Sequence, residues 1–468
     1  MQIPQLMSEQ YREAAELIKE SEDIKVYSHI DCDGICSGAI LSTILDRQEK
    51  EHEIEFVNLD VLDDIELTHD LTIFSDLGSG QHITTNAKDG QKIIILDHHP
   101  PLRELDYKND KPYTYLEINP LHHGIDGSYY VCGGGLCYFL AKEFGYTDLS
   151  WIGVLSAIGD MQNQKSGHME GLNEIIQQDA IDGGYLELIK NDLNIYGRNT
   201  RPLFVALSYF SDVRLPITNN TTETMAVLEE LGIDEKHNRK TLNELTQKEK
   251  GKVFQYMMGM LSKAVPPKYI PYLPQLIIGD SYTFLKEDYD SFLRDGSEFS
   301  TAMNACGRNK EEKVAMEVLK GDRFVALDEL ESVSKTHRYN LATSIAKVAE
   351  GDETSIIEME NLQYFDGDGI KPEIVGTITG MILGYCNWKK PIIGFTQTDN
   401  DGLKVSLRCS RLLSYDGIHF GNIIREISAE VGGSGGGHAM ACGAYIPIEK
   451  KSEFLELFNE KLNGLLTT

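Results

Sequence analysis

Short runs of consecutive apolar residues alternate with helix-like patterns along the first third of the chain. The apolar runs are IKVYS (24–28), IEFVNL (54–59), LTIFSD (71–76) and KIIILDHH (92–99). Helical patterns are predicted at 5–20, 35–45, in the glycine-led VCGGGLCYFLAKEF (131–144), at about 149–160 and at 171–190. Continuous β-branched runs separated by helices are typical of a parallel sheet covered on both faces. The chain is therefore predicted to begin with an α/β domain.

The pattern changes twice further along. Residues 200–320 are mixed, with helices predicted at 224–231 and 242–261, and with prolines in PPKYIPYLP (266–274) that do not fit a regular helix. From residue 374 onward short strands and helices return, and the last helix is expected from residue 452. We predict three regions: an α/β domain (1–195), a connecting and inserted, mainly helical region (196–320), and a smaller C-terminal α/β domain (321–468).

Composition narrows the function classes. The net charge of −29 argues against diffuse binding of nucleic acid, although it leaves room for a local basic track. No apolar run approaches the ~20 residues of a membrane span, and the acidic, amphipathic N-terminus does not resemble a signal peptide. We expect a cytoplasmic protein that does not associate with a membrane. Eight cysteines in 468 residues are too few for a disulfide scaffold, so reduced and mostly buried thiols are expected.

The segment SHIDCDG (28–34) carries the first candidate chemistry. It follows one predicted strand and precedes a predicted helix, with Gly34 allowing a tight turn between them. Alternation along an extended chain would point His29, Asp31 and Asp33 to one side. The sequence therefore predicts that an imidazole and two carboxylates converge at this strand end.

Three further segments place similar groups at the ends of other predicted elements. They are Asp76 in FSDLGSG, Asp97, His98 and His99 in LDHHP, and Asp160 in SAIGDM. In an open parallel sheet such groups gather at the carboxyl ends of the strands. So many carboxylates cannot cluster without cations, and two divalent ions roughly 3.5–4 Å apart would suit phosphoester hydrolysis.

The candidate ligands divide into two sets that share one residue. One ion is expected at His29, Asp31 and Asp76, and the other at Asp33, Asp76, His98 and Asp160. Asp76 would bridge the two ions, and the mixture of imidazole and carboxylate favours Mn over Mg or Ca, with Mg as the second choice. Asp97 and His99 would support the ligands or contact the scissile phosphate. The predicted catalytic residues are thus Asp76, Asp97 and His99.

These segments carry a family resemblance. HIDCDG, SDLGSG, DHHP and IGDM resemble the four motifs of the DHH phosphoesterase superfamily, and GGSGGGH (432–438) resembles the glycine-rich motif of its associated C-terminal domain. The resemblance spans nearly the whole chain. It implies hydrolysis of phosphodiester or pyrophosphate bonds by two Mn ions, with the domains facing across a cleft.

Two segments narrow the resemblance within that superfamily. IYGRNTRPL (195–203) and SEFSTAMNACGR (297–308) look like archaeal RecJ-like exonucleases, including the GINS-associated nuclease. That group is similar to the helicase cofactor of eukaryotic replication, in which the catalytic ligands are degraded. Here the ligands are retained, which favours an active enzyme.

Several polar residues are candidates for holding a nucleic-acid backbone. The glycine-rich run, read as a loop, would offer backbone N–H groups to an anion next to His438, and arginine pairs with phosphate through a planar fork. The predicted substrate contacts are Ser406, Arg408, Arg411, Gly435, Gly436, Gly437, His438, Arg308, Asn304 and Arg198, with Arg201 as a weaker candidate. His122 and His123 are expected to be solvated loop residues and not ligands.

The predicted function is a Mn-dependent, single-strand-specific exonuclease. Its substrate would be DNA, with RNA as a second substrate, and the RecJ resemblance suggests the 5′ to 3′ direction and a role in replication or repair. One alternative is a phosphodiesterase of short oligonucleotides or cyclic dinucleotides. Another is a replication-complex subunit that binds GINS and the replicative helicase, with a secondary nuclease activity.

Overall fold

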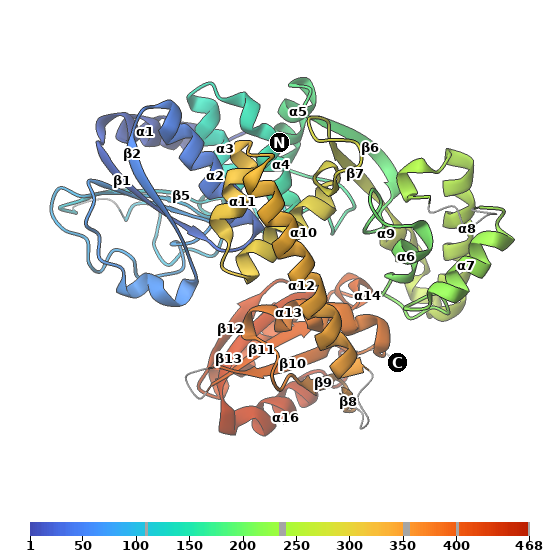
Figure 1. Cartoon of the computed structure of the whole chain (residues 1–468). Coiled ribbons are helices and arrows are strands. Elements are labelled where there is room, and N and C mark those ends of the chain that lie inside the picture. Colours follow the sequence, from blue (N-terminus) through green and yellow to red (C-terminus); the bar gives the residue numbers. More distant parts are fainter. Residues whose placement is uncertain (108–110, 234–239, 350–355, 399–401, 467–468) are drawn as a thin grey trace. The chain divides into compact units, whose positions relative to one another are not determined.

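The computed structural model describes residues 1–107, 111–233, 240–349, 356–398 and 402–466 (Figure 1). The chain forms two compact units, each built from two separate stretches of sequence. The first unit contains residues 1–192 and 279–335, and the second contains 193–278 and 336–468. The predicted division into three regions, with boundaries near residues 195 and 320, stays a prediction.

The first unit contains a parallel sheet and several helices. Its elements are α1 (Gln5–Glu20), β1 (Asp23–His29), α2 (Cys32–Arg47), β2 (Glu51–Val57), η1 (Leu59–Asp64), β3 (Leu71–Ser75), β4 (Lys92–Leu96), β5 (Thr114–Ile118), η2 (Pro120–His123), α3 (Gly133–Glu143), η3 (Thr147–Leu149), α4 (Ser150–Gly159), α5 (Asn173–Asp182), η6 (Phe292–Arg294), α10 (Gly296–Arg308) and α11 (Glu312–Lys320). Two strands, β6 (Leu186–Leu193) and β7 (Ile278–Phe284), pair where the chain passes between the units, and α12 (Val325–Ala349) also runs from the first unit into the second.

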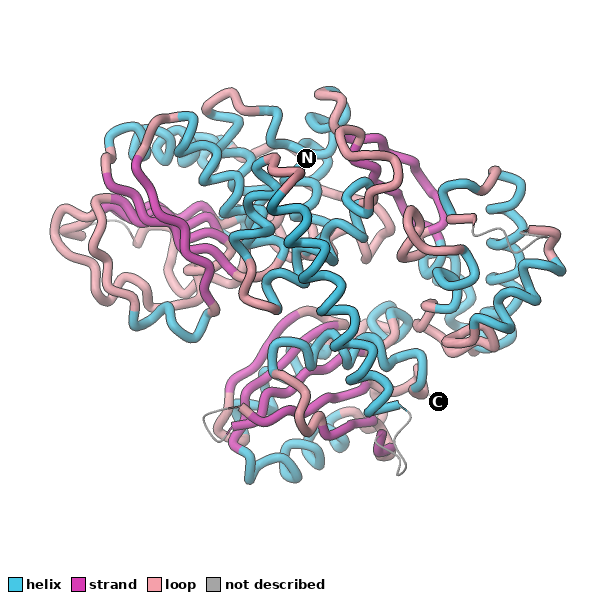
Figure 2. Tube along the Cα trace, in the orientation of Figure 1, coloured by secondary structure: helices cyan, strands magenta, loops and turns pink. Residues whose placement is uncertain are grey.

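The five strands of the first unit lie in the order β2-β1-β3-β4-β5, and all neighbouring pairs are parallel. Alternate residues along each strand face opposite sides, so Ile73 and Ile94 join the core under the helices, whereas Phe74 and Ile93 join a second core. Figure 2 shows helices on one face of this sheet and mostly loops on the other. The predicted parallel sheet with two covered faces is confirmed.

Two helices from much later in the chain complete the first unit. Both α10 and α11 pack against α2, and α10 also packs against α4 (Figure 1). The contact is close, because a Cβ added to Gly307 would lie 1.8 Å from the carbonyl oxygen of Ile30. Arg308 is therefore fixed beside the segment that carries the first candidate ligands.

The second unit is a mainly helical region followed by a mixed sheet. Its elements are α6 (Leu203–Ser208), α7 (Thr221–Glu230), η4 (Leu242–Glu244), α8 (Gln247–Ala264), η5 (Pro267–Tyr272), α9 (Leu273–Ile277), β8 (Ile356–Glu358), β9 (Gln363–Asp366), α13 (Pro372–Met381), η7 (Ile382–Tyr385), β10 (Ile392–Gln397), β11 (Gly402–Arg408), α14 (Arg411–Tyr415), α15 (Phe420–Glu430), β12 (Ser434–Gly437), β13 (Ala441–Pro447), η8 (Ile448–Lys450) and α16 (Lys451–Lys461). The sheet order is β12-β13-β11-β10-β9-β8, with only β9 and β10 parallel among the described pairs. The predicted α/β class with a smaller C-terminal α/β part is confirmed.

Two element predictions were wrong. The helix expected over 171–190 ends at Asp182, and the residues from Leu186 onward form β6 and pair with β7. The glycine run expected to be a loop forms the edge strand β12, where Gly436 pairs with Gly443 of β13. In both places a pairing with a distant or following strand outweighs the local pattern.

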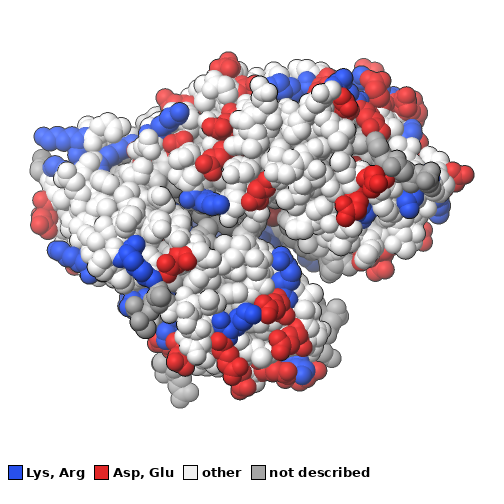
Figure 3. Space-filling view, turned by 180° about the vertical axis from the view of Figure 1, so that it is seen from behind, with Lys and Arg blue, Asp and Glu red and all other residues white. Residues whose placement is uncertain are grey.

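The cysteines are reduced and buried, as the composition predicted, and the surface carries charges of both signs (Figure 3). All eight cysteines are buried and free. Basic and acidic residues are interspersed over the face that Figure 3 shows, as expected for a charged surface of mixed sign. Among the described residues, every helix is too short or too polar to cross a membrane.

Candidate metal centre

The imidazole and the two carboxylates of the SHIDCDG segment lie where the chain passes from β1 into α2. His29 is the last residue of β1, Asp31 is the N-cap of α2, and Asp33 lies in the first turn of that helix. The convergence was predicted correctly, but extended alternation is not its cause. Gly34 is needed for close packing rather than for a turn, because a Cβ there would lie 2.1 Å from the carbonyl oxygen of His29.

The first group of candidate ligands consists of His29, Asp31 and Asp76. The Nδ1 atom of His29 lies 3.1 Å from Oδ2 of Asp31 and 3.4 Å from Oδ2 of Asp76. The three residues present ligand atoms that lie close enough together to hold one ion. This is the first set that the sequence predicted.

Asp76 has an unusual backbone conformation directly after β3. Its φ is +59°, in the left-handed region that non-glycine residues rarely adopt. Its N–H donates to the carbonyl oxygen of Leu96 at the end of β4 at 2.9 Å. Strain of this kind costs on the order of 1–3 kcal/mol and is typical of functional sites. After this strained turn the Asp76 carboxylate lies beside His29 and His98.

The second group consists of Asp33, His98 and Asp160. The Nε2 atom of His98 lies 3.5 Å from Asp33 Oδ2, 3.9 Å from Asp160 Oδ2 and 3.2 Å from Oδ1 of Asp76. Asp76 thus directs Oδ2 at the first group and Oδ1 at the second. It also forms a third group with His98 and His99. The structure brings together all the predicted ligands.

Outer hydrogen bonds orient the second group. His98 Nδ1 lies 2.7 Å from the carbonyl oxygen of Gly127, which leaves Nε2 directed at the carboxylates. Gln162 donates to the same carbonyl oxygen at 2.7 Å and to Asp160 Oδ2 at 2.8 Å. Such partners fix the tautomer and the orientation of metal-ligating histidines. Gln162 was not predicted, and its position two residues after IGD is the one sequence signal for it.

The glycine-led helix α3 supports Asp33. The N–H groups of Gly133 and Gly134 donate to the two Asp33 oxygens at 2.8 and 2.7 Å, and the Ser156 hydroxyl also donates to Oδ1. The N-terminus of a helix favours negative charge. The run VCGGG, predicted only as the start of a helix, therefore also holds a candidate ligand.

A Gly133→Ala variant tests this packing. The added Cβ would lie 2.6 Å from Cβ of Asp76, so we expect unfolding free energy to fall by about 1–3 kcal/mol and Mn²⁺ affinity to fall about 10- to 100-fold. Thermal unfolding and isothermal titration with Mn²⁺ measure the two effects.

The matched control is Gly251→Ala in α8, where an added Cβ meets nothing within 4 Å. It should leave Mn²⁺ affinity unchanged and raise stability by about 0.5–1 kcal/mol. Equal Mn²⁺ affinity in both variants would contradict the role given to Gly133.

The buried histidines show that the site fits divalent cations. Among the described residues, His29 Nδ1 and His98 Nε2 are buried and have no hydrogen-bond partner. An imidazole nitrogen left open among carboxylates is a metal-ligand arrangement, and mixed nitrogen and oxygen donors suit Mn²⁺. The acidic and imidazole groups can thus bind metal.

The pKa values of Asp33 and His98 also agree with a cation site. Burial, together with repulsion from Asp76 and Asp160, raises the pKa of Asp33 well above its ordinary value. Burial alone would lower the pKa of His98, but attraction by Asp160, Asp33 and Asp76 raises it well above the usual range. Burial and neighbouring negative charge thus disfavour the charged form of Asp33, and a bound cation would offset this effect.

Asp97 positions His99 rather than facing the two groups. It accepts from Nδ1 of His99 at 2.8 Å and from the N–H of Ser79 at 2.9 Å. Burial would raise the pKa of Asp97, but His99, His98 and the Ser79 N–H hold it well below its ordinary value. The His99 side chain is 44% exposed, so it is the member of this pair that can meet a substrate.

Two predicted substrate residues lie in the first unit. The Arg308 guanidinium is close enough to Asp31 to help lower the pKa of that carboxyl, after His29 and the Gly34 N–H, against the opposing effect of burial. Asn304 Oδ1 instead accepts from the N–H of Cys32 at 3.0 Å and fixes the start of α2. The contact of both residues with substrate stays a prediction, and the structural use of Asn304 was not predicted.

The remaining candidates lie in the second unit. Arg411 forms a buried ion pair with Asp212, with Nη2 2.6 Å from Oδ2. Arg198 is buried and donates from Nε to Asn243 at 2.8 Å, and Arg201 lies over the ring of Tyr209. The guanidinium groups of Arg411 and Arg198 thus have structural partners, and their predicted contact with substrate stays a prediction.

The strand β11 and the glycine strand hold the other candidates. Gly376 of α13 lies against both Ser406 and Arg408, since a Cβ there would be 3.0 Å from Arg408 Nη2. Gly435, Gly436 and Gly437 lie in β12, and His438 follows it, with its N–H donating to Ala441 at 2.9 Å. Arg425 of α15, which the sequence did not single out, lies beside Gly436.

Comparison with known proteins agrees with this architecture. Family models match the N-terminal domain of the DHH family at residues 23–157, a DHH-CID domain at 195–273 and a DHHA1 domain at 359–464. An uncharacterized protein from Methanocaldococcus jannaschii is 30% identical over 445 residues, which are 93% of this chain and 92% of that protein.

Solved structures share the fold at low sequence identity. CDC45 from Entamoeba histolytica is similar with a TM-score of 0.61 and 14% identity, over 97% of this chain and 98% of that chain. RecJ from Thermus thermophilus, solved in complex with Mn²⁺, has a TM-score of 0.56 and 15% identity, over 98% of this chain and 55% of that chain. The matched domains and the relative covered along nearly its whole length show that this chain belongs to the DHH family.

Proposed function

We propose that this chain is a Mn²⁺-dependent phosphodiesterase that degrades single-stranded nucleic acid from one end. The observation that carries the proposal is the pair of ligand groups, His29/Asp31/Asp76 and Asp33/His98/Asp160, which Asp76 joins because its Oδ1 lies 3.2 Å from His98 Nε2. Two divalent ions bound there would neutralise the charge of a scissile phosphate and lower the pKa of water. The proposed substrate is single-stranded DNA, with RNA second, and the proposed direction is 5′ to 3′.

The residues of the chain have separate tasks in this proposal. The two groups hold the ions, and Asp33 is kept in place by the start of α3. Arg308, beside Asp31, binds a non-bridging phosphate oxygen through its guanidinium. His99, fixed by Asp97 and partly exposed, donates a hydrogen bond or a proton to the reacting phosphate.

The comparisons support a nuclease over a smaller phosphodiesterase. An exonuclease RecJ, solved with bound manganese, has a TM-score of 0.52 over 98% of this chain and 95% of that chain. RecJ from Thermus thermophilus was likewise solved with Mn²⁺. The groups that could hold metal, His29/Asp31/Asp76 and Asp33/His98/Asp160, also support the proposal.

The test is digestion of long single strands labelled at either end, with Mn²⁺, Mg²⁺ or a chelator. We expect release of labelled nucleotides from the 5′ label first, with Mn²⁺ more effective than Mg²⁺. Activity in chelator would overturn the metal dependence. Cleavage restricted to substrates of a few nucleotides would favour the oligonucleotide phosphodiesterase instead.

An Arg308→Ala variant tests the phosphate contact. A hydrogen bond to a charged group contributes about 1.5–3 kcal/mol, so we expect kcat/KM for a single strand to fall about 10- to 100-fold. Mn²⁺ affinity should stay the same or increase, because a positive charge beside Asp31 is removed.

The control is Lys313→Ala on the exposed surface of α11, which should keep kcat/KM. A loss of Mn²⁺ affinity in the Arg308 variant would mean that this residue supports the ligands and does not contact substrate.

A second candidate function is a subunit of a replication complex. The similarity to CDC45 over nearly the whole of both chains favours it, and the proposed partners are GINS and the replicative helicase. Co-elution of the purified chain with GINS in size-exclusion chromatography tests this role independently of any nuclease activity. Separate elution at micromolar concentration would speak against it.

A further inference from the structure

A buried acidic residue lies beside the metal centre without belonging to it. Glu117 is in β5, the strand next to β4, where it pairs with Ile95 two residues before Asp97. It is 6% exposed. None of the three ligand groups found among the described residues includes it. A fully buried carboxylate requires several partners, and these partners connect it to the site.

The Glu117 carboxylate is held by two hydroxyl donors. Ser79 Oγ donates to Oε1 and Tyr115 OH donates to Oε2, each at 2.5 Å. Arg103 Nε lies 3.7 Å from Oε2 and donates to the same tyrosine oxygen. Glu117 thus forms a buried ion pair with Arg103 that is completed by neutral hydroxyls.

Arg103 uses the rest of its guanidinium on the loop that follows Asp76. It donates to the carbonyl oxygens of Gly78, Ser79 and Gln81, the last at 2.6 Å. These carbonyl groups belong to SDLGSG and its next residue. The cation therefore fixes the backbone only two residues beyond the strained Asp76.

The same loop is hydrogen-bonded to the segment Asp97–His99. The N–H of Ser79 donates to Asp97, which in turn accepts from the His99 ring. Asn119, two residues after Glu117, donates both to Ser79 Oγ at 2.9 Å and to the carbonyl oxygen of His99 at 2.8 Å. The end of β5 is thus joined by hydrogen bonds to both segments that carry Asp76 and His98.

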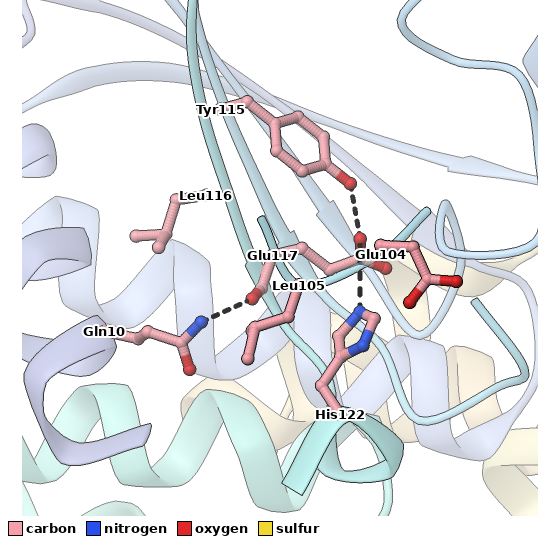
Figure 4. A pocket seen from close by; sticks show the side chains of 7 residues that line it. All are labelled: Gln10, Glu104, Leu105, Tyr115, Leu116, Glu117 and His122. Carbon is pink, nitrogen blue, oxygen red and sulfur yellow. Dashed lines mark hydrogen bonds and ion pairs between the residues drawn. The ribbon is translucent and has the colours of Figure 1, made fainter. Parts of the chain in front are cut away.

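A small pocket lies on the other side of Glu117 (Figure 4). Gln10, Glu104, Leu105, Tyr115, Leu116, Glu117 and His122 line it, and its volume of about 10 Å³ admits no more than one water molecule. His122 is 8% exposed at its side chain and faces Glu117 at 3.7 Å, whereas His123 meets Gln10. The prediction of solvated histidines was therefore wrong for His122, and the pocket is too small for an organic ligand.

We infer that Glu117 and Arg103 are a positioning pair for the metal centre. They hold the loop after Asp76, and through Ser79 they hold Asp97 and His99. The pair does not touch metal or substrate. This inference rests on the proposed function for its catalytic meaning, but its effect on metal binding is independent of any substrate.

The test compares Glu117→Gln with Glu104→Gln in the full chain, by Mn²⁺ titration followed by electron paramagnetic resonance. Both residues line the same pocket, but Glu104 is exposed and binds nothing in the loop. Outer partners of metal ligands typically contribute 10- to 100-fold to affinity, so we expect Glu117→Gln to weaken Mn²⁺ binding by about that factor and Glu104→Gln to leave it unchanged. Thermal unfolding and kcat and KM on single strands are measured on the same samples, and kcat should fall while KM stays constant.

The outcomes separate this inference from the proposed function. Lower thermal stability with unchanged Mn²⁺ affinity would make the pair merely structural and overturn the inference. If Glu117→Gln does not fold, Ser79→Ala decides, because it removes the hydroxyl link and keeps the backbone bond to Asp97; unchanged Mn²⁺ affinity in Ser79→Ala overturns the inference. Wild-type protein that binds Mn²⁺ but hydrolyses no strand would overturn only the proposed function.

Discussion

Replacing Asp76 with alanine is expected to abolish hydrolysis of single strands. Each oxygen of this carboxylate faces a different histidine, with Oδ2 3.4 Å from His29 Nδ1 and Oδ1 3.2 Å from His98 Nε2. Loss of the shared ligand would disturb both ions at once. Since removal of a single electrostatic contact to a transition state costs about 10²–10³ in kcat, we expect at least the upper end of this range. The rate of product formation under single-turnover conditions measures hydrolysis.

The shape-conserving variant Asp76→Asn separates charge from packing. It should fold as the wild type does, bind fewer Mn²⁺ ions per chain and lose activity to a similar extent. The control is Asp182→Asn, at the exposed end of α5 in the same unit, which should keep both stoichiometry and rate. An Asp76→Asn enzyme with two bound ions and normal kcat would refute the bridging assignment.

The strands and helices of the first unit could be predicted because their apolar patterns are local. Runs such as KIIIL are long enough to identify β4. The expected alternation with α-helices holds between β1 and β2, whereas the described residues between β2 and β5 contain no α-helix. The strand β5 was missed because TYLEI interrupts its apolar run with Glu117, a polar residue whose partners include the distant Ser79 as well as Tyr115. That missed strand carries Glu117, the acidic member of the positioning pair.

The candidate ligands could be predicted for a different reason. Their side chains must lie directly at strand or helix ends, so that residues far apart in sequence meet at one edge of the sheet. The cause given for SHIDCDG was nevertheless wrong, because the N-cap geometry of Asp31 replaces the expected extended alternation. Sequence pattern therefore indicated which residues meet, but not how the backbone brings them together.

The different roles of the candidate arginines could not be predicted from the sequence. Arg411 and Arg308 look alike in sequence, each next to small polar or glycine residues. Arg411 pairs with Asp212, about 200 residues away, whereas Arg308 is brought beside Asp31 by the packing of α10 on the β1–α2 segment. Only tertiary contacts distinguish an arginine buried in an ion pair from one that lies beside a candidate metal ligand.

Mn²⁺ is expected to stabilise the chain strongly at neutral and alkaline pH, and much less in acid. A cation that binds only the folded state raises the unfolding free energy by about 2.7 kcal/mol when present at 100 times its Kd. The ligands must be deprotonated to bind, and in the ligand-free site the pKa values of Asp33, His98 and His29 are all raised. Protons therefore compete with the cation for these side chains up to a higher pH than they would for an isolated carboxylate or imidazole.

The sign of the pH effect follows from this competition. As the pH falls, Asp33 and the two histidines take up protons, so the apparent Kd for Mn²⁺ should rise by about tenfold per pH unit for each proton that binding displaces. Thermal unfolding with and without Mn²⁺ between pH 6 and 8 (about two units around the ordinary histidine value) measures the shift directly. The double variant His29→Ala, His98→Ala should bind Mn²⁺ more weakly and with a smaller pH slope, because two of the competing groups are removed. A stabilisation by Mn²⁺ that does not change over this range would show that the ion binds elsewhere, away from the groups that meet at Asp76.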